Sequence, residues 1–276
     1  MEASPATFPL VFAAKPVPVR APGGGVPSLR GPVEAAAPED LHPALWRAHQ
    51  VGQSREAVFA SGHAELDAVL PGGGWPARAL TELLLPHPGI GEWRLLAPAL
   101  AALQAQQRGV MLFDPPAVPF AWALAACGLD VQQLYVVRSR EAARGRAHGL
   151  LPAADVLWAL EQSLKSGHLG AALAWLPARL AADALRRLQL AAQAHDGPVF
   201  LLRDEAQRVR PSPAPLRLWL RPAGADELRV QLLKRRGPPL ARPLVLVLAP
   251  VLSAPARARA AWPPAPAVSS PQEIPS

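Results

Sequence analysis

The stretch LTELLLPHPGIGEW, residues 80–93, decides how the rest of the chain is interpreted. It begins with a short apolar run, passes through a loop that contains Gly89 and Gly91, and leads into apolar residues with helical spacing up to about residue 107. Short apolar runs of about four to eight residues are typical of buried strands, and longer periodic stretches are typical of helices. The stretch therefore predicts a buried strand, a glycine loop and a helix, in that order.

The residues that follow repeat the same alternation. Apolar runs rich in Leu and Val are separated by longer stretches with helical spacing. Such alternation implies parallel strands joined by right-handed crossovers, which is a doubly wound α/β sheet. The predicted strands are residues 80–85, 110–113, 134–137, 171–176 and 199–202, and the predicted helices are residues 92–107, 120–127, 154–166 and 178–195.

The pattern changes after residue 202. Residues 216–221 and 227–233 have strand character around a turn at residues 222–226, which predicts a hairpin. Residues 243–248 would add a final strand. We therefore expect a mostly parallel sheet with a C-terminal hairpin extension.

Composition divides the chain into one domain and two tails. Residues 1–40 and 251–276 are rich in Pro, Ala and Gly and poor in bulky apolar residues. Such segments bury too little apolar surface to fold by themselves, so we expect both tails to be disordered. The single α/β domain is expected to occupy residues 41–250.

Composition also excludes several classes of protein. Cys127 is the only cysteine, which rules out an internal disulfide and a metal site built on several thiolates. The chain begins unlike a signal peptide and has no apolar run of about 18 residues, so we expect a cytoplasmic protein without membrane contact. The net charge of +7 suits nucleic acid or an acidic partner protein, and equally a solvated basic surface.

The loop at residues 86–93 stands where a phosphate-binding P-loop would stand. Such a loop needs glycines for backbone approach, a lysine for the terminal phosphates and a Ser or Thr hydroxyl for magnesium. Gly89 and Gly91 are present, but Glu92 and Trp93 occupy the places of the lysine and the hydroxyl. No lysine occurs between Lys15 and Lys165. We therefore predict no ATP hydrolysis and no cofactor.

Three segments carry a resemblance to a known family. Residues 61–76 (SGHAELDAVLPGGGWP) with residues 79–83 (ALTEL) are similar to the segment that precedes the P-loop in RecA recombinases. With residues 45–48 (LWRA) and 233–238 (LKRRGP), they resemble the ImuA family more closely. Members of that family are RecA/SulA-like proteins encoded beside the polymerase-like protein ImuB. The resemblance covers about residues 42–248.

The resemblance implies a RecA-like fold that has lost its catalytic groups. Pro116 falls where the catalytic glutamate would be, two residues after Asp114, and Trp175 stands where the magnesium-binding aspartate would be. The first DNA-binding loop of RecA has no room at residues 176–179, and the second is reduced to about residues 204–215. We therefore expect a pseudo-ATPase without enzymatic activity.

The function that the resemblance implies is accessory to error-prone repair. A member of this family would be an adaptor of SOS-induced translesion DNA synthesis, associated with the nucleoid during DNA damage. Its partners would be an ImuB-like polymerase-family protein and an error-prone alpha-type DNA polymerase, with RecA as a further partner. Three alternatives stay open: a SulA-like cell-division inhibitor that binds FtsZ, a modulator of RecA filaments, and an ATPase with an unorthodox site.

Several basic and aromatic residues are candidates for binding DNA or a partner, although each could equally belong to a solvated face. Arginine and lysine in such clusters give sequence-independent, salt-sensitive contacts with phosphates. One further group, at residues 45–47, could anchor a partner because Trp and Arg dominate interface energetics. The basic candidates are Lys234, Arg235, Arg236, Arg229, Arg208, Arg210, Arg140 and Arg144, the last two in a cluster with Arg138 and Arg146, and the anchor candidates are Leu45, Trp46 and Arg47.

The remaining histidines and tryptophans predict no site. The histidines show no metal-ligand spacing, so we expect surface or loop positions and no bound metal. Tryptophans inside predicted elements are expected in the core. The histidines are His63, His87, His148, His168 and His195, and the tryptophans are Trp122, Trp158 and Trp175.

Overall fold

The computed structural model describes residues 57–138, 154–177, 180–240, 242–251 and 255. These residues belong to one compact unit, Arg47–Ser276. The predicted tails lie largely outside the described residues, so their expected disorder stays a prediction. The anchor candidates Leu45, Trp46 and Arg47 and the basic residues Arg140, Arg144 and Arg146 also lie outside them.

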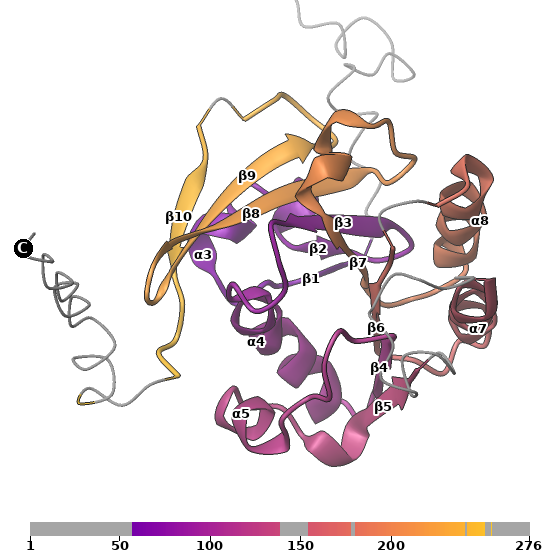
Figure 1. Ribbon diagram of the computed structural model, residues 1–276, viewed down its shortest axis with the longest axis horizontal. Coiled ribbons are helices and arrows are strands. Elements are labelled where there is room, and N and C mark those ends of the chain that lie inside the picture. The colour runs from indigo at the N-terminus through magenta and orange to yellow at the C-terminus, as the bar shows by residue number, and fades with distance from the viewer. Residues whose placement is uncertain (1–56, 139–153, 178–179, 241, 252–254, 256–276) are drawn as a thin grey trace, which may run out of the picture. The chain divides into compact units, whose positions relative to one another are not determined.

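An eight-stranded sheet forms the centre of the fold, in the order β10-β9-β8-β3-β7-β6-β4-β5 (Figure 1). The strands from β8 to β5 pair in parallel, and β8, β9 and β10 pair antiparallel. The predicted fold class is thereby confirmed. The strands are β3 (Leu80–Leu85), β4 (Val110–Phe113), β5 (Leu134–Val137), β6 (Ala171–Trp175), β7 (Val199–Asp204), β8 (Leu216–Gly224), β9 (Glu227–Lys234) and β10 (Leu244–Val247).

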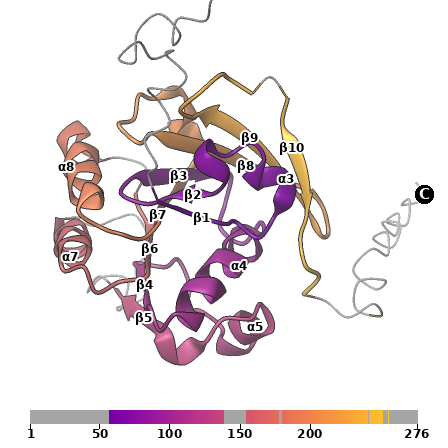
Figure 2. The same ribbon diagram turned by 180° about the vertical axis from the view of Figure 1, so that it is seen from behind.

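Helices cover both faces of the parallel part of the sheet (Figures 1 and 2). Helix α4 packs with one apolar cluster, and α7 and α8 pack with a second cluster on the opposite face. The helices are α4 (Glu92–Ala105), α5 (Ala121–Ala126), α7 (Ala154–Lys165) and α8 (Ala182–Gln193), with short 3-10 turns η2 (Val131–Gln133) and η3 (Glu205–Val209). Each of these four α-helices overlaps a predicted helix, and the ends differ by a few residues.

Strand β3 shows why these layers form. All six of its residues are buried, and successive side chains of a strand point to opposite faces. Leu83 and Leu85 join the cluster that contains α4, whereas Leu80 joins the cluster that contains α7 and α8. A strand that is apolar on both faces needs cover on both, which explains its central position.

A small N-terminal subsheet was not predicted. Strand β1 (Val58–Phe59) pairs antiparallel with β2 (Trp75–Pro76), and α3 (Ala64–Asp67) and the 3-10 turn η1 (Pro71–Gly73) lie between them. Gly74 lies against β1, and a Cβ there would stand 2.4 Å from the Phe59 carbonyl oxygen. Gly72 has φ 76°, a conformation that glycine adopts readily in tight turns.

Two tryptophans expected in the core lie on the surface instead. Trp122 is 79% exposed and Trp158 is 65% exposed, whereas Trp175 is 3% exposed as predicted. Helix α7 buries Val156, Leu157, Leu160 and Leu164, and Trp158 lies off that stripe. Helix α5 is only six residues long and buries Leu124 alone.

His195 lies in a loop, one of the two settings predicted for the histidines, but it is fully buried. It lies between α8 and β7, where Gly197 approaches Gly170 so closely that a Cβ at Gly197 would meet both the Gly170 carbonyl and the His195 ring. Both of its ring nitrogens lack a hydrogen-bond partner among the described residues. Burial and the nearby Arg108 lower the pKa of His195 to about 4, against a smaller opposing effect of Asp196.

Within the described part of the chain, no helix is long and apolar enough to cross a membrane.

Candidate functional site

The predicted glycine loop connects β3 to α4 at the carboxyl edge of the parallel strands. Ligands of open α/β sheets bind at this edge, where helix N-termini present free N–H groups. Gly91 is the residue before the first turn of α4 and has φ 120°. A Cβ there would also stand 2.9 Å from Leu248 Cδ1, so the position requires glycine.

The carboxylate of Glu92 occupies the loop. The Gly89 N–H donates to Glu92 Oε1 at 2.7 Å, and the Gly91 N–H donates to Oε2 at 3.2 Å. Glu92 is 2% exposed. N–H groups at a helix N-terminus favour a negative charge, and in a P-loop that charge belongs to phosphate. Here the protein's own side chain supplies it.

Two aromatic side chains meet beside the loop. Trp93 lies in the first turn of α4 and Trp175 ends β6, at the positions expected from the sequence for a P-loop hydroxyl and a magnesium-binding aspartate. Their ring centroids lie 5.6 Å apart at a tilt of 35°. The two side chains therefore form one apolar contact, worth about 0.5–1.5 kcal/mol beyond the area that it buries.

Asp114 and Pro116 follow the end of β4. Asp114 is buried, has φ 50°, and donates its N–H to the Val137 carbonyl of the neighbouring strand at 2.8 Å. Pro116, expected from the sequence at the place of a catalytic glutamate, is exposed. A proline has no group that could orient a water molecule.

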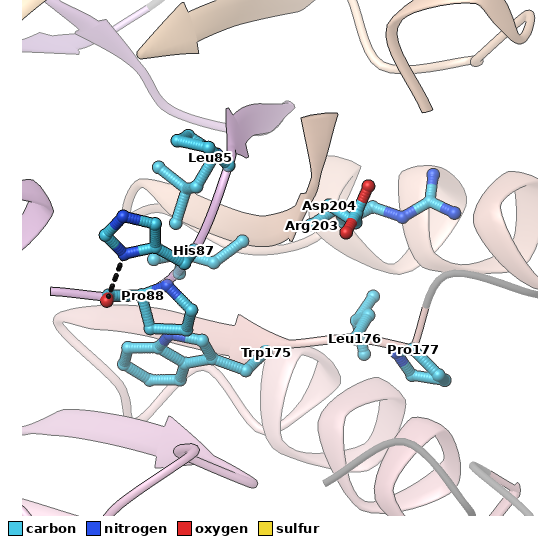
Figure 3. Close-up of a pocket in the computed structure, with 10 residues that line it drawn as sticks. Leu85, His87, Pro88, Trp175, Leu176, Pro177, Arg203 and Asp204 are labelled. Carbon is cyan, nitrogen blue, oxygen red and sulfur yellow. Dashed lines mark hydrogen bonds between the residues drawn. The ribbon is translucent and has the colours of Figure 1, made fainter. Parts of the chain in front are cut away.

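A hollow of about 330 Å³ remains between the glycine loop and the ends of β6 and β7 (Figure 3). Most of its lining is apolar. His87 bonds the Pro88 carbonyl across 3.1 Å, and Asp204 accepts from the Ala206 N–H at 2.7 Å. The lining residues are Leu85, Pro86, His87, Pro88, Trp175, Leu176, Pro177, Leu202, Arg203 and Asp204.

Arg203 lines the hollow, but its guanidinium is bound elsewhere. Arg203 Nη1 donates to Glu82 Oε1 at 3.0 Å, and Arg217 Nε donates to Glu82 Oε2 at 2.6 Å. All three side chains are buried and join β7, β3 and β8. Arg217 also donates to the carbonyls of Gln207 and Arg210, which holds the turn η3 against the sheet. The glutamate that marked this strand in the sequence is therefore structural.

The predicted basic cluster at the end of β9 is partly bound by the protein itself. Arg229 and Arg236 are exposed, and Lys234 is exposed while it donates to the Ser212 carbonyl at 2.9 Å. Arg235 was expected to be exposed, but it is half-buried. Its guanidinium donates to the carbonyls of Pro238 and Val69, because the chain turns back toward the N-terminal subsheet at this point.

Arg208 lies in a cluster that sequence reasoning missed. Its guanidinium carbon lies 4.8 Å from the centre of the Trp219 ring, and that of Arg221 lies 5.2 Å from the same ring. The alternation of Arg217, Trp219 and Arg221 along one strand was the available signal, since such residues share a face. Arg210 is exposed in the same turn, and Arg138 is half-buried at the end of β5.

Among the described residues, no group of His, Cys, Asp and Glu could hold a metal ion. The sheet and the loop define a class: a doubly wound α/β protein whose P-loop equivalent is filled by its own carboxylate.

Comparison with known proteins gives one distant relative. No family model matches the chain. The chain is 31% identical over 121 residues to the cell division inhibitor SulA of Edwardsiella piscicida, which is 44% of this chain and 65% of that protein. The match thus spans a little less than two thirds of the relative's length.

Proposed function

We propose that this chain is a non-catalytic binding protein of the SOS response to DNA damage. The observation that carries the proposal is the Glu92 carboxylate, which accepts the loop N–H groups that a nucleotide would need. A triphosphate would have to displace a buried anion and would then face its charge. The contact between Trp93 and Trp175 supports the same conclusion, because it replaces two ligands of a magnesium ion.

The first candidate function is inhibition of cell division. The similarity to the cell division inhibitor SulA supports it, and a protein without catalysis must act by binding a target. The target for this candidate is the division protein FtsZ. This reading was the alternative at the level of sequence, and the similarity to SulA favours it over the translesion role.

The second candidate is an accessory role in translesion synthesis, with an ImuB-like protein and an error-prone alpha-type polymerase as partners. One contact favours it. Arg235, within the segment 233–238, donates to the Val69 carbonyl, beside the segment 70–76. Two of the segments that resemble the ImuA family therefore meet in space, although more than 150 residues separate them.

Induced expression separates the two candidates. A division inhibitor produces long, undivided cells when it is overproduced, and excess FtsZ restores division. A translesion accessory protein leaves cell length unchanged, and its deletion lowers damage-induced mutagenesis. Normal cell length together with unchanged mutagenesis would reject both candidates.

Turnover measurements test the absence of catalysis. We expect no ATP hydrolysis, with or without single-stranded DNA. The double substitution Glu92→Lys/Trp93→Thr should also be inactive, since Pro116 and Trp175 still supply no carboxylate. Turnover that survives repurification and is lost in Gly91→Asp would overturn the proposal.

A further inference from the structure

The antiparallel end of the sheet has one covered face and one open face. Leu218, Leu220 and Val230 belong to the apolar cluster that contains α4. Directly paired residues of antiparallel strands share a face, and the cluster of α7 and α8 contains no residue of β8, β9 or β10. Exposed side chains confirm that the opposite face is open: Val247 of β10 is 75% exposed, and Arg221 and Arg229 are exposed.

This outer face brings together cations from two strands and one turn. Arg221 of β8 pairs with Arg229 of β9, and Trp219 pairs with Gln231. The guanidinium of Arg208, which belongs to η3, lies over the Trp219 ring. We call the surface formed by Arg208, Trp219, Arg221, Arg229 and Gln231 the outer face.

Trp219 is fixed in place at the centre of the outer face. Its Nε1 donates to Glu205 Oε2 at 2.7 Å, and the guanidiniums of Arg208 and Arg221 lie against its ring. Stacking on an aromatic ring restricts a guanidinium and leaves its N–H edge free to bind. The arginines are thus held ready for a planar or anionic ligand before one arrives.

The outer face carries more cations than carboxylates. Among the described residues, Arg208, Arg221 and Arg229 form no ion pair with a carboxylate. Two carboxylates lie nearby: Glu205 accepts from Trp219 Nε1, and Glu227 begins β9 beside Gly224. A surface with this excess of positive charge attracts a polyanion.

We propose that the outer face binds single-stranded nucleic acid. Cations that track a phosphate backbone, together with a fixed aromatic ring and guanidinium planes that bases can stack on, are the elements of such sites. An acidic protein segment would match the charge but would leave the stacked planes unused. The proposal goes beyond the proposed function, which concerns a protein target, so either can fail without the other.

Binding of a fluorescein-labelled oligothymidylate, followed by anisotropy, tests the proposal on the full chain. We expect salt-dependent binding that the double substitution Arg221→Glu/Arg229→Glu weakens at least about tenfold. The slope of log affinity against log salt should become shallower by about 1.4, which corresponds to two lost phosphate contacts. The milder Arg221→Gln/Arg229→Gln should also weaken binding. This variant checks that the loss of affinity in the charge-reversed protein is not caused by misfolding.

The matched control is Lys165→Glu/Arg186→Glu. It makes the same change in net charge on α7 and α8, where both side chains are exposed and form no ion pair among the described residues. Its affinity should stay within about twofold of the unmodified protein. Trp219→Phe should keep more affinity than Trp219→Leu, since a ring remains for stacking.

Three outcomes would overturn the proposal. The first is no binding of the oligothymidylate at low salt. The second is an equal loss of affinity in the outer-face variant and the control variant, which would place binding elsewhere. The third is competition by polyglutamate as effective as that by unlabelled oligothymidylate at equal charge, which would identify an acidic protein as the partner.

Discussion

The glycine loop and the outer face differ in whether their charged groups are paired within the protein. In the loop, a carboxylate and the N–H groups that attract it belong to the same protein, and the site is closed. On the outer face, cations lie against an aromatic ring and form no ion pair among the described residues. The N–H groups of the loop already have an acceptor within the protein, so an anionic ligand would add little there. A surface with an excess of cations is stabilised when an anionic ligand binds. We therefore look for function at the second region.

The largest expected effect is on the buried cluster of Glu82, Arg203 and Arg217, whose paired cations contrast with the exposed cations of the outer face. Glu82→Ala leaves Arg203 and Arg217 buried without their carboxylate, so it should lower the free energy of unfolding by about 3–5 kcal/mol. Urea denaturation measures the change. The control Glu227→Gln alters an exposed carboxyl group and should have little effect. A loss below about 1 kcal/mol in Glu82→Ala would show that water reaches this cluster.

His195 tests the rule that buried polar groups pair, since it is buried and both ring nitrogens lack a partner among the described residues. Its pKa is about 4 in the folded protein and about 6.5 when exposed. The unfolded chain therefore binds the proton first as the pH falls. Stability should be complete above pH 6.5 and should fall by up to about 3 kcal/mol between pH 6.5 and pH 4.

Urea titrations across this pH range measure the slope. His195→Leu should remove this part of the pH dependence, whereas substitution of the exposed His168 by Gln should keep it. An unchanged slope in His195→Leu would assign the effect to other groups.

Glu92→Ala asks whether the loop is closed by its own anion. The substitution removes the acceptor of two N–H groups and should destabilise the protein by about 1–3 kcal/mol. Inorganic phosphate should then raise the melting temperature of the variant more than that of the unmodified protein, because the vacated N–H groups can accept an anion. Glu92→Gln, which keeps one acceptor oxygen, is the intermediate control. Equal responses to phosphate in all three proteins would contradict the closed loop.

The smallest effects distinguish two arginines near the end of β9. Arg235→Ala should cost about 1 kcal/mol, because its half-buried guanidinium bonds two carbonyls. Arg229→Ala should change stability by less than about 0.5 kcal/mol, since the side chain is exposed and unpaired. Thermal melts of the two variants give the comparison. Equal losses would mean that Arg229 has a structural role after all.

The sequence was sufficient for the layers of the fold. Strands such as β6 are continuous apolar runs, and the helices have the expected spacing, so local pattern and final structure agree. The glycine loop between β3 and α4 could also be located, because its glycines follow a buried strand and precede a helix.

The features that could not be predicted depend on contacts between residues far apart in the sequence. The pairing of Arg208 with Trp219 needs the turn η3 to fold back over β8, and no local pattern encodes that contact. Arg235 was expected to be exposed because burying an unpaired charge is costly, but the Val69 carbonyl, which lies 166 residues away in the sequence, accepts from its guanidinium. Trp122 was assigned to the core by residue type, although the six-residue helix α5 buries only Leu124.

The central position of β3 has a consequence for how the protein is made. Its hydrogen-bonding neighbours on both sides, β7 and β8, begin at Val199 and Leu216, about 120 residues or more further along the chain. A ribosome that synthesises about 5–20 residues per second exposes β3 for several seconds before either neighbour has emerged. During that time its leucines, Leu80 and Leu83–Leu85, are a target for chaperones and proteases. The cellular level of this protein should therefore respond sharply to the supply of both.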